Sequence, residues 1–206
     1  MSRYFMLNKP MGYITARRDA RHRTVMELFP DELRDKMFPV GRLDKDTEGL
    51  LLVTDDGALN HELLTPESHV DKTYLFYAVG DINRERLSDL EVGAEVFPTN
   101  DYITSPAKVK IIEESRLEDI SDILPSMYRS LVRKKPHTRV TVGQITITEG
   151  KKHQVKHMVA YAGGKVVYLR RISIGKLTLD ESLEKGKYRE LYDDEVLLLK
   201  NRTENV

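Results

Sequence analysis

The chain has 206 residues, and its 33 basic and 33 acidic side chains give a formal net charge of zero. It contains no cysteine, which excludes disulfide bonds, thiolate metal sites and thiol nucleophiles. No apolar run reaches the roughly 18 residues that a membrane-spanning helix needs, and the start lacks a signal-peptide pattern. We therefore expect a cytoplasmic protein without a membrane partner.

Predicted elements in the first half are short, β-prone runs separated by turns and brief helical segments. Good capping residues stand before the helical segments, and Pro30 and Pro66 end two of them. The predicted strands are residues 4–9, 13–15, 50–54 and 72–79. The predicted helical segments are 25–29 after Thr24, a turn within 31–37, and one from Asp55 or Asp56 to Leu64.

The second half continues in the same way, except for residues 113–137, which begin acidic and end basic. We predict this stretch to be a surface insertion, partly helical. The predicted strands are 95–97, 107–112, 141–148 and 166–174, and the predicted helices are 83–90, 151–162 and 193–200. Strands outnumber helices and turns separate many of them. These patterns favour an α+β fold with a mixed, largely antiparallel central sheet flanked by helices and loops.

The stretch GRLDKDTEGLLLV, residues 41–53, places three acids and two bases in a turn that runs into an apolar segment. A buried strand gives such a turn rigidity, and the turn gives a reactive carboxylate access. Asp44 is the candidate carboxylate. The alternative is that Asp44 only accepts hydrogen bonds from backbone amides of its own turn.

Two metal sites are suggested by spacing. Residues 44–55 imitate a calcium loop, with acids at 44, 46, 48 and 55 and Gly49 at the sixth position, but Pro39-Val40-Gly41 precedes them instead of a helix. His153 and His157 have the spacing of a zinc pair on a helix, but Gln154 stands where a zinc protease has its Glu. We expect neither site to hold a metal, and we expect the histidines to be polar surface or RNA-facing residues.

Charge is unevenly distributed along this neutral chain. Residues 151–176 contain seven Lys or Arg and no Asp or Glu, whereas acids dominate residues 180–206. The basic stretch is either a solvated face or a surface that binds a polyanion such as RNA.

Five blocks in order decide between these alternatives. They are Asn8-Lys9-Pro10 with Gly12, the block from Gly41 to Gly57, Lys72 with Tyr74, the block from Glu149 to Met158, and Leu169 to Gly175 with Arg171. Together they resemble the catalytic domain of the RsuA-type ribosomal RNA pseudouridine synthases over nearly the whole chain except residues 113–137. The resemblance implies the pseudouridine synthase fold with an active site in a cleft across the sheet.

The implied reaction isomerises a uridine within RNA, for which no metal, nucleotide or redox cofactor is needed. The family's essential Asp corresponds to Asp44 and its pocket Tyr to Tyr74, whose ring would stack on the flipped uracil. The pocket base corresponds to Lys156, where many members have Arg. Beside Asp44, such a cation would favour the ionised carboxylate.

Further RNA contacts are implied around these three residues. Arg42 would contact the flipped nucleotide or a phosphate, and the remaining candidate RNA-binding residues are Lys152, Gln154, Arg170 and Arg171. We expect a single catalytic domain over residues 1–206, acting as a monomer, without the S4 domain that many relatives carry before the first block. The alternatives are a non-catalytic RNA-binding or ribosome assembly factor on the same fold, and a calcium-binding module at residues 44–55.

Overall fold

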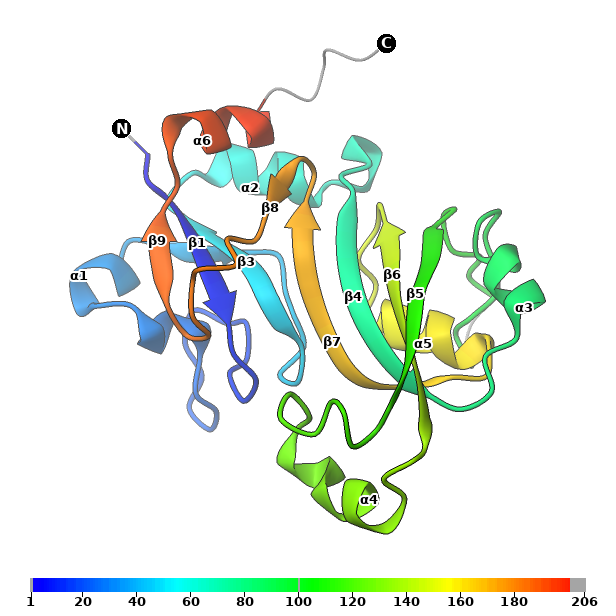
Figure 1. Ribbon diagram of the computed structural model, residues 1–206. Coiled ribbons are helices and arrows are strands. Elements are labelled where there is room, and N and C mark those ends of the chain that lie inside the picture. Colours follow the sequence, from blue (N-terminus) through cyan, green and yellow to red (C-terminus); the bar gives the residue numbers. More distant parts are fainter. Residues whose placement is uncertain (1, 100, 201–206) are drawn as a thin grey trace. The chain divides into compact units, whose positions relative to one another are not determined.

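A computed structural model describes residues 2–99 and 101–200 and divides the chain into two compact units (Figure 1). Unit 1 combines residues 1–72 with 170–206, and unit 2 is the continuous segment 73–169. Two strands begin in one unit and end in the other: β4 (Lys72–Val79) and β7 (Lys165–Ile174). No helix within the described ranges is long and apolar enough to cross a membrane.

The strands of unit 1 centre on β3 (Glu48–Thr54), which is buried at every position because neighbours cover both of its faces. β3 pairs antiparallel with β1 (Tyr4–Lys9) and with β2 (Phe38–Val40), and parallel with the Arg170–Arg171 part of β7. At the margins, β9 (Tyr188–Glu190) pairs antiparallel with β1, and β8 (Leu177–Thr178) with the end of β7.

The helices of unit 1 are short. They are η1 (Val25–Leu28), α1 (Asp31–Arg34), α2 (Gly57–Leu64), η2 (Pro66–Ser68) and α6 (Asp193–Lys200). Asp56 caps α2, since its carboxylate accepts from the Leu59 N–H at 3.0 Å. Leu59, Leu63 and Leu199 join residues of β1 and β3 in one hydrophobic core, so α2 and α6 cover the same part of the sheet.

Unit 2 has the strand order β5-β6-β4-β7, counting only the first half of β7. β5 (Lys108–Arg116) pairs antiparallel with β6 (Arg139–Ile147), with a register shift between Ile111 and Glu113. The alternating burial along β4 matches its KTYLFYAV sequence. The helical segments are α3 (Arg84–Asp89), η3 (Ser126–Tyr128), α4 (Arg129–Lys134) and α5 (Gln154–Tyr161).

The predicted mixed, largely antiparallel sheet with flanking helices is confirmed, and the strands at 4–9 and 72–79 and the helix at 193–200 have the predicted bounds. The strands predicted at 13–15 and 95–97 are wrong, because each makes only a single bridge, Ile14–Thr24 and Glu95–Ile103. The helix predicted from residue 151 begins at Gln154, since His153 has φ +56° and cannot continue a right-handed helix.

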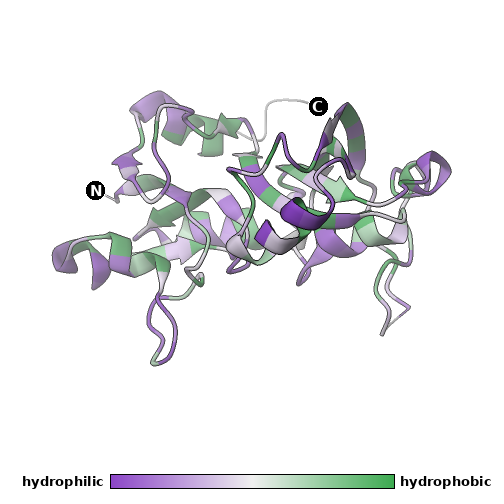
Figure 2. Cartoon of the chain, turned by 60° about the horizontal axis from the view of Figure 1, so that its bottom comes forward, coloured by the Kyte–Doolittle hydropathy of each residue, from purple (hydrophilic) through white to green (hydrophobic). Residues whose placement is uncertain are grey.

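Residues 113–137 are less irregular than their charge pattern indicates. Residues 113–116 continue β5 past the bulge. Leu117 and Ile120 are buried against Val140 and Val142 of β6, so the excursion has a small core of its own. In Figure 2 the green, hydrophobic stretches lie mainly on strands and helices, whereas the purple, hydrophilic stretches lie both on loops and along helices.

Candidate active site

The loop between β2 and β3 carries Arg42 and Asp44. Gly41 enters the loop with φ +69°, a conformation that other residues rarely adopt. Leu43 is buried and anchors the loop, while Arg42 is exposed and Asp44 is half-buried. The loop thus holds a partly accessible carboxylate on a buried hydrophobic anchor, next to the most buried strand of the unit.

A buried lysine from β1 holds the backbone of this loop. The side chain of Lys9 is fully buried, and its Nζ donates to the carbonyl oxygens of Asp44 at 3.0 Å, Thr47 at 2.8 Å and Pro10 at 3.1 Å. The Thr47 N–H also donates to the Asp44 carbonyl, at 3.1 Å. These bonds place the Asp44 backbone between two donors and restrict where its carboxylate can point.

Two further contacts clamp the same loop from the N-terminal segment. The hydroxyl of Thr15 donates to the Leu43 carbonyl at 2.8 Å and lies 3.1 Å from the Leu43 N–H, which donates back to it. The Gly12 N–H donates to the Lys45 carbonyl at 2.8 Å. Residues from Lys9 to Thr15 therefore act as a brace for the Asp44 loop. The sequence contains the Asn8-Lys9-Pro10 block, but a buried ammonium is not readable from it, and this positioning role was not predicted.

The three acids of the loop differ in their surroundings. Glu48 is buried at 5% exposure and forms an ion pair with Lys185 at 2.7 Å. Asp46 is exposed and Asp44 half-buried. β2 and β3 flank the loop, whereas a calcium loop of the EF-hand type is entered from a helix. Within residues 2–99 and 101–200, no group of three His, Asp or Glu could hold a metal ion.

Arg170 and Arg171 are the first residues of β7 that belong to unit 1, and they pair with Glu48 and Gly49 of β3. Gly49 has φ +101°, and a Cβ added there would lie 2.2 Å from the Arg171 carbonyl oxygen, so only glycine fits. Arg170 is half-exposed, whereas Arg171 is 3% exposed and donates from Nε to the Leu50 carbonyl at 2.8 Å. This burial favours a structural role for Arg171, and its predicted phosphate contact stays a prediction.

The other predicted site residues belong to unit 2. Tyr74 lies in β4 with 7% exposure, and Lys156 lies half-buried in α5. Lys152 is exposed just before α5. Gln154 is 2% exposed and donates to Glu149 at 2.5 Å, so it holds the turn before α5 and presents little surface to RNA. The convergence of Tyr74 and Lys156 on Asp44 stays a prediction.

The family model for RNA pseudouridylate synthase matches residues 3–161, which is more than half of the chain. The chain belongs to the RNA pseudouridine synthase family. This synthase is 45% identical to the uncharacterized RNA pseudouridine synthase YtzG of Bacillus subtilis, over 95% of this chain and 72% of that protein. It is 37% identical to the ribosomal small subunit pseudouridine synthase A of Salmonella typhimurium, over 94% of this chain and 72% of the relative.

Solved structures agree with this membership. A crystal structure of a pseudouridylate synthase matches the synthase with a TM-score of 0.78 and 35% identity, over 97% of this chain and 74% of that one. An archaeal Nop10–Cbf5 complex has a TM-score of 0.56 at 17% identity, over 89% of this chain and 51% of that one, and thus shares the fold alone. The synthase is therefore an RNA isomerase by family, which confirms the resemblance drawn from the five sequence blocks.

Proposed function

We propose that this synthase converts a uridine of ribosomal RNA to pseudouridine and that Asp44 is its catalytic carboxylate. The support for the RNA is the similarity to the Salmonella typhimurium relative, which is a ribosomal small subunit pseudouridine synthase. The observation that carries the assignment of Asp44 is the brace of Lys9 and Thr15, which immobilises this loop on both sides of one half-buried acid. Catalysis by positioning needs a carboxylate that is carried by such a fixed backbone.

The reaction moves one base within one nucleotide. The N1–C1′ bond breaks, the uracil turns, a C5–C1′ bond forms, and C5 loses a proton while N1 gains one. A carboxylate suits this chemistry, because it can attack or stabilise the electron-poor C1′ or remove a proton there. Tyr74 would stack on the flipped uracil, and the Lys156 ammonium would favour the ionised form of Asp44. The site must also exclude water, which would otherwise trap the detached sugar carbon. Arg42, exposed on the same loop, would contact a phosphate of the flipped nucleotide.

The experiment compares Asp44→Asn with Asp46→Asn, an exposed acid of the same loop. Small-subunit ribosomal RNA transcribed without modification is incubated with each variant, and pseudouridine is mapped after carbodiimide treatment. Asp44→Asn should lose at least about 10⁴-fold in rate, the order that removal of a covalent or acid–base group costs, with RNA affinity within a few-fold of the wild type. Asp46→Asn should stay active.

Full activity of Asp44→Asn would contradict the assignment. RNA binding without any pseudouridine formation by the wild-type protein would favour the alternative function, a non-catalytic RNA-binding or ribosome assembly factor. RNA binding should also weaken as salt rises, because phosphate contacts release counterions.

A further inference from the structure

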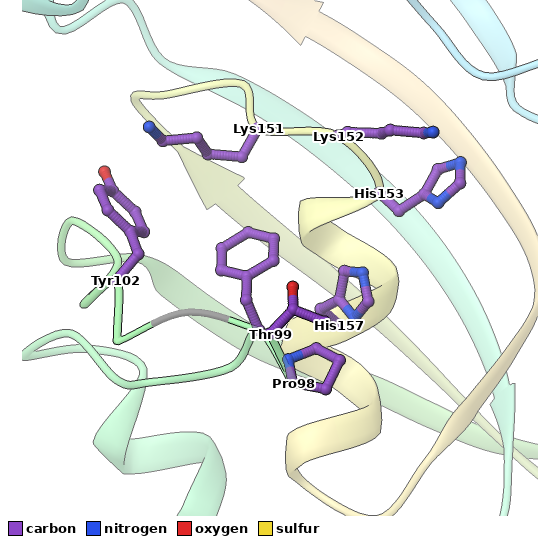
Figure 3. Close-up of a pocket in the computed structure, with 8 residues that line it drawn as sticks. Pro98, Thr99, Tyr102, Lys151, Lys152, His153 and His157 are labelled. Atoms are coloured by element: carbon purple, nitrogen blue, oxygen red, sulfur yellow. The ribbon is translucent and has the colours of Figure 1, made fainter.

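A second feature of the chain, formed entirely by unit 2, lies between the segment after α3 and the start of α5 (Figure 3). It is a cavity of about 490 Å³, within the roughly 300–1,000 Å³ range of small-ligand pockets. Its lining residues are Phe97, Pro98, Thr99, Tyr102, Lys151, Lys152, His153 and His157. Neither Asp44 nor Tyr74 is among them. We call this feature the α5 cavity.

The wall of the α5 cavity is aromatic. The ring of Phe97 lies 5.1 Å from that of His157 and 6.0 Å from that of Tyr102, measured between centroids. All three side chains are half-buried, so each keeps part of its ring surface accessible to a ligand. Accessible aromatic rings that are held by one another form a platform on which a nucleobase can stack, whatever its identity.

The rim of the cavity carries two lysines and a histidine. Lys151, Lys152 and His153 are exposed there, and the ammonium of Lys151 lies 4.1 Å from the centre of the Tyr102 ring. Figure 3 shows Lys152 and His153 projecting to the same side. His153 holds φ +56°, an uncommon backbone conformation for a residue other than glycine, and such conformations concentrate at functional sites.

One acid, Glu149, lies beside this cavity and is bonded to donors of the protein. The carboxylate of Glu149 accepts a hydrogen bond from the Tyr102 hydroxyl, one from the Ser105 N–H at 2.9 Å, and one from Gln154 at 2.5 Å. The bond from Tyr102 also raises the pKa of its phenol to about 12, which keeps the ring neutral. Glu149 thereby fixes the platform and is committed to donors of the protein, so its charge opposes an incoming phosphate less than that of an open carboxylate.

We propose that the α5 cavity binds a second nucleotide of the substrate RNA, with its base stacked on Phe97, Tyr102 or His157. Its two flanking phosphates would lie at Lys151 and at Lys152, whose side chains extend in opposite directions in Figure 3. This inference rests on the proposed function, because it takes RNA as the ligand. Stacking and phosphate contacts read no particular base, so the site contributes affinity for a single-stranded segment of the RNA without specifying its sequence. It also gives a purpose to His153 and His157, which form no metal site with a third ligand in the described part of the chain.

The test uses two fluorescent oligomers of equal length, oligoadenylate of 12 nucleotides and an abasic ribose phosphate oligomer. Oligoadenylate has no uridine, so it reports on binding apart from the uridine pocket. The wild type should bind oligoadenylate about tenfold more tightly than the abasic oligomer, the order contributed by one stacked base. Phe97→Ala should abolish this difference. Because Phe97 is half-buried, Lys151→Ala combined with Lys152→Ala provides a second variant at exposed positions.

The double lysine variant should reduce the slope of log affinity against log salt by about 1.4, or about 0.7 for each lost contact to a single strand. The matched control is Lys108→Ala with Lys110→Ala, which removes the same charge from exposed positions of β5. Equal binding of both oligomers by the wild type, or equal effects of the two double variants, would overturn the α5 cavity site.

Pseudouridine formation in ribosomal RNA is measured in parallel. Phe97→Ala should raise KM about tenfold and leave kcat within about twofold, since one stacking contact contributes to binding away from the reacting atoms. If Phe97→Ala forms pseudouridine with the same KM as the wild type, only the proposal that the cavity binds RNA is refuted. The opposite result has two parts: the wild type forms no pseudouridine, but Phe97→Ala still binds oligoadenylate more weakly than the wild type. That result would refute the proposed function and leave the cavity as an RNA-binding site.

Discussion

Lys9→Met is the change that most directly tests how the Asp44 loop is held. Methionine has nearly the length and apolar stem of lysine but donates no hydrogen bond. The three carbonyl oxygens of Pro10, Asp44 and Thr47 would each lose a donor that lies 2.8–3.1 Å away in the wild type. At about 1 kcal/mol net for each bond, the variant should lose about 3 kcal/mol of stability. The burial of an ammonium has its own desolvation cost, which limits the loss to this range.

Thermal melting gives a simple measurement. For a chain of this size, a loss of about 3 kcal/mol lowers Tm by about 6–12 °C. The control is Lys45→Met, an exposed lysine in the same loop, which should change stability by less than about 0.5 kcal/mol. A Tm of Lys9→Met within about 2 °C of the wild type would refute the reasoning, because it would mean that the three bonds do not hold the loop.

Two further changes test the frame around the loop. Gly49→Ala should lower the stability by about 3 kcal/mol, because its Cβ would lie 2.2 Å from the Arg171 carbonyl oxygen at a residue with φ +101°. The control in the same melting assay is Gly57→Ala, whose new Cβ would have open space around it. Equal Tm values of the two variants would contradict the close approach at Gly49. Glu195→Gln should cost about 1 kcal/mol at pH 7 by weakening the paired bonds, both 2.7 Å, that Arg189 donates. The hydrogen bond from Arg189 holds the pKa of Glu195 below its ordinary value of 4.5, so this stability is present above that pH and lost as pH falls through the folded pKa. Urea unfolding should therefore show the largest difference between wild type and variant above about pH 5, and a difference that stays constant down to pH 3 would exclude the mechanism.

Local patterns were sufficient for the parts of the fold that depend on local sequence. The LLLV run predicted β3, the KTYLFYAV alternation predicted β4, and Asp56 before an apolar run predicted the start of α2. Tertiary pairing made the difference elsewhere. β9 has three residues and forms only because β1 offers a partner at the other end of the chain, so its sequence alone carries no strand signal.

The candidate site divides in the same way. Asp44 and Arg42 were named as candidates because their block is contiguous and distinctive, and their roles stay predictions. Phe97 and Tyr102 were not predicted: Phe97 lay in a wrongly predicted strand at 95–97, Tyr102 lay in a stretch without any pattern, and only folding brings Phe97 to both Tyr102 and His157. Gln154 and Arg171 were predicted to face RNA, but their burial at 2% and 3% is a property of packing that no charge pattern shows.

The division of the chain into units has a consequence for the order of folding during synthesis. Unit 2 is continuous, so all of its strands are available once residue 169 has been made. Unit 1 needs segments from before and after unit 2: Phe5 of β1 pairs with Glu190 of β9, and Leu59 shares a core with Leu199. Closing so long a loop is entropically costly and slow. The Asp44 loop therefore rests on a sheet whose last strand, β9, is synthesised after the whole of unit 2, and this sheet can be completed only once residue 190 has been made.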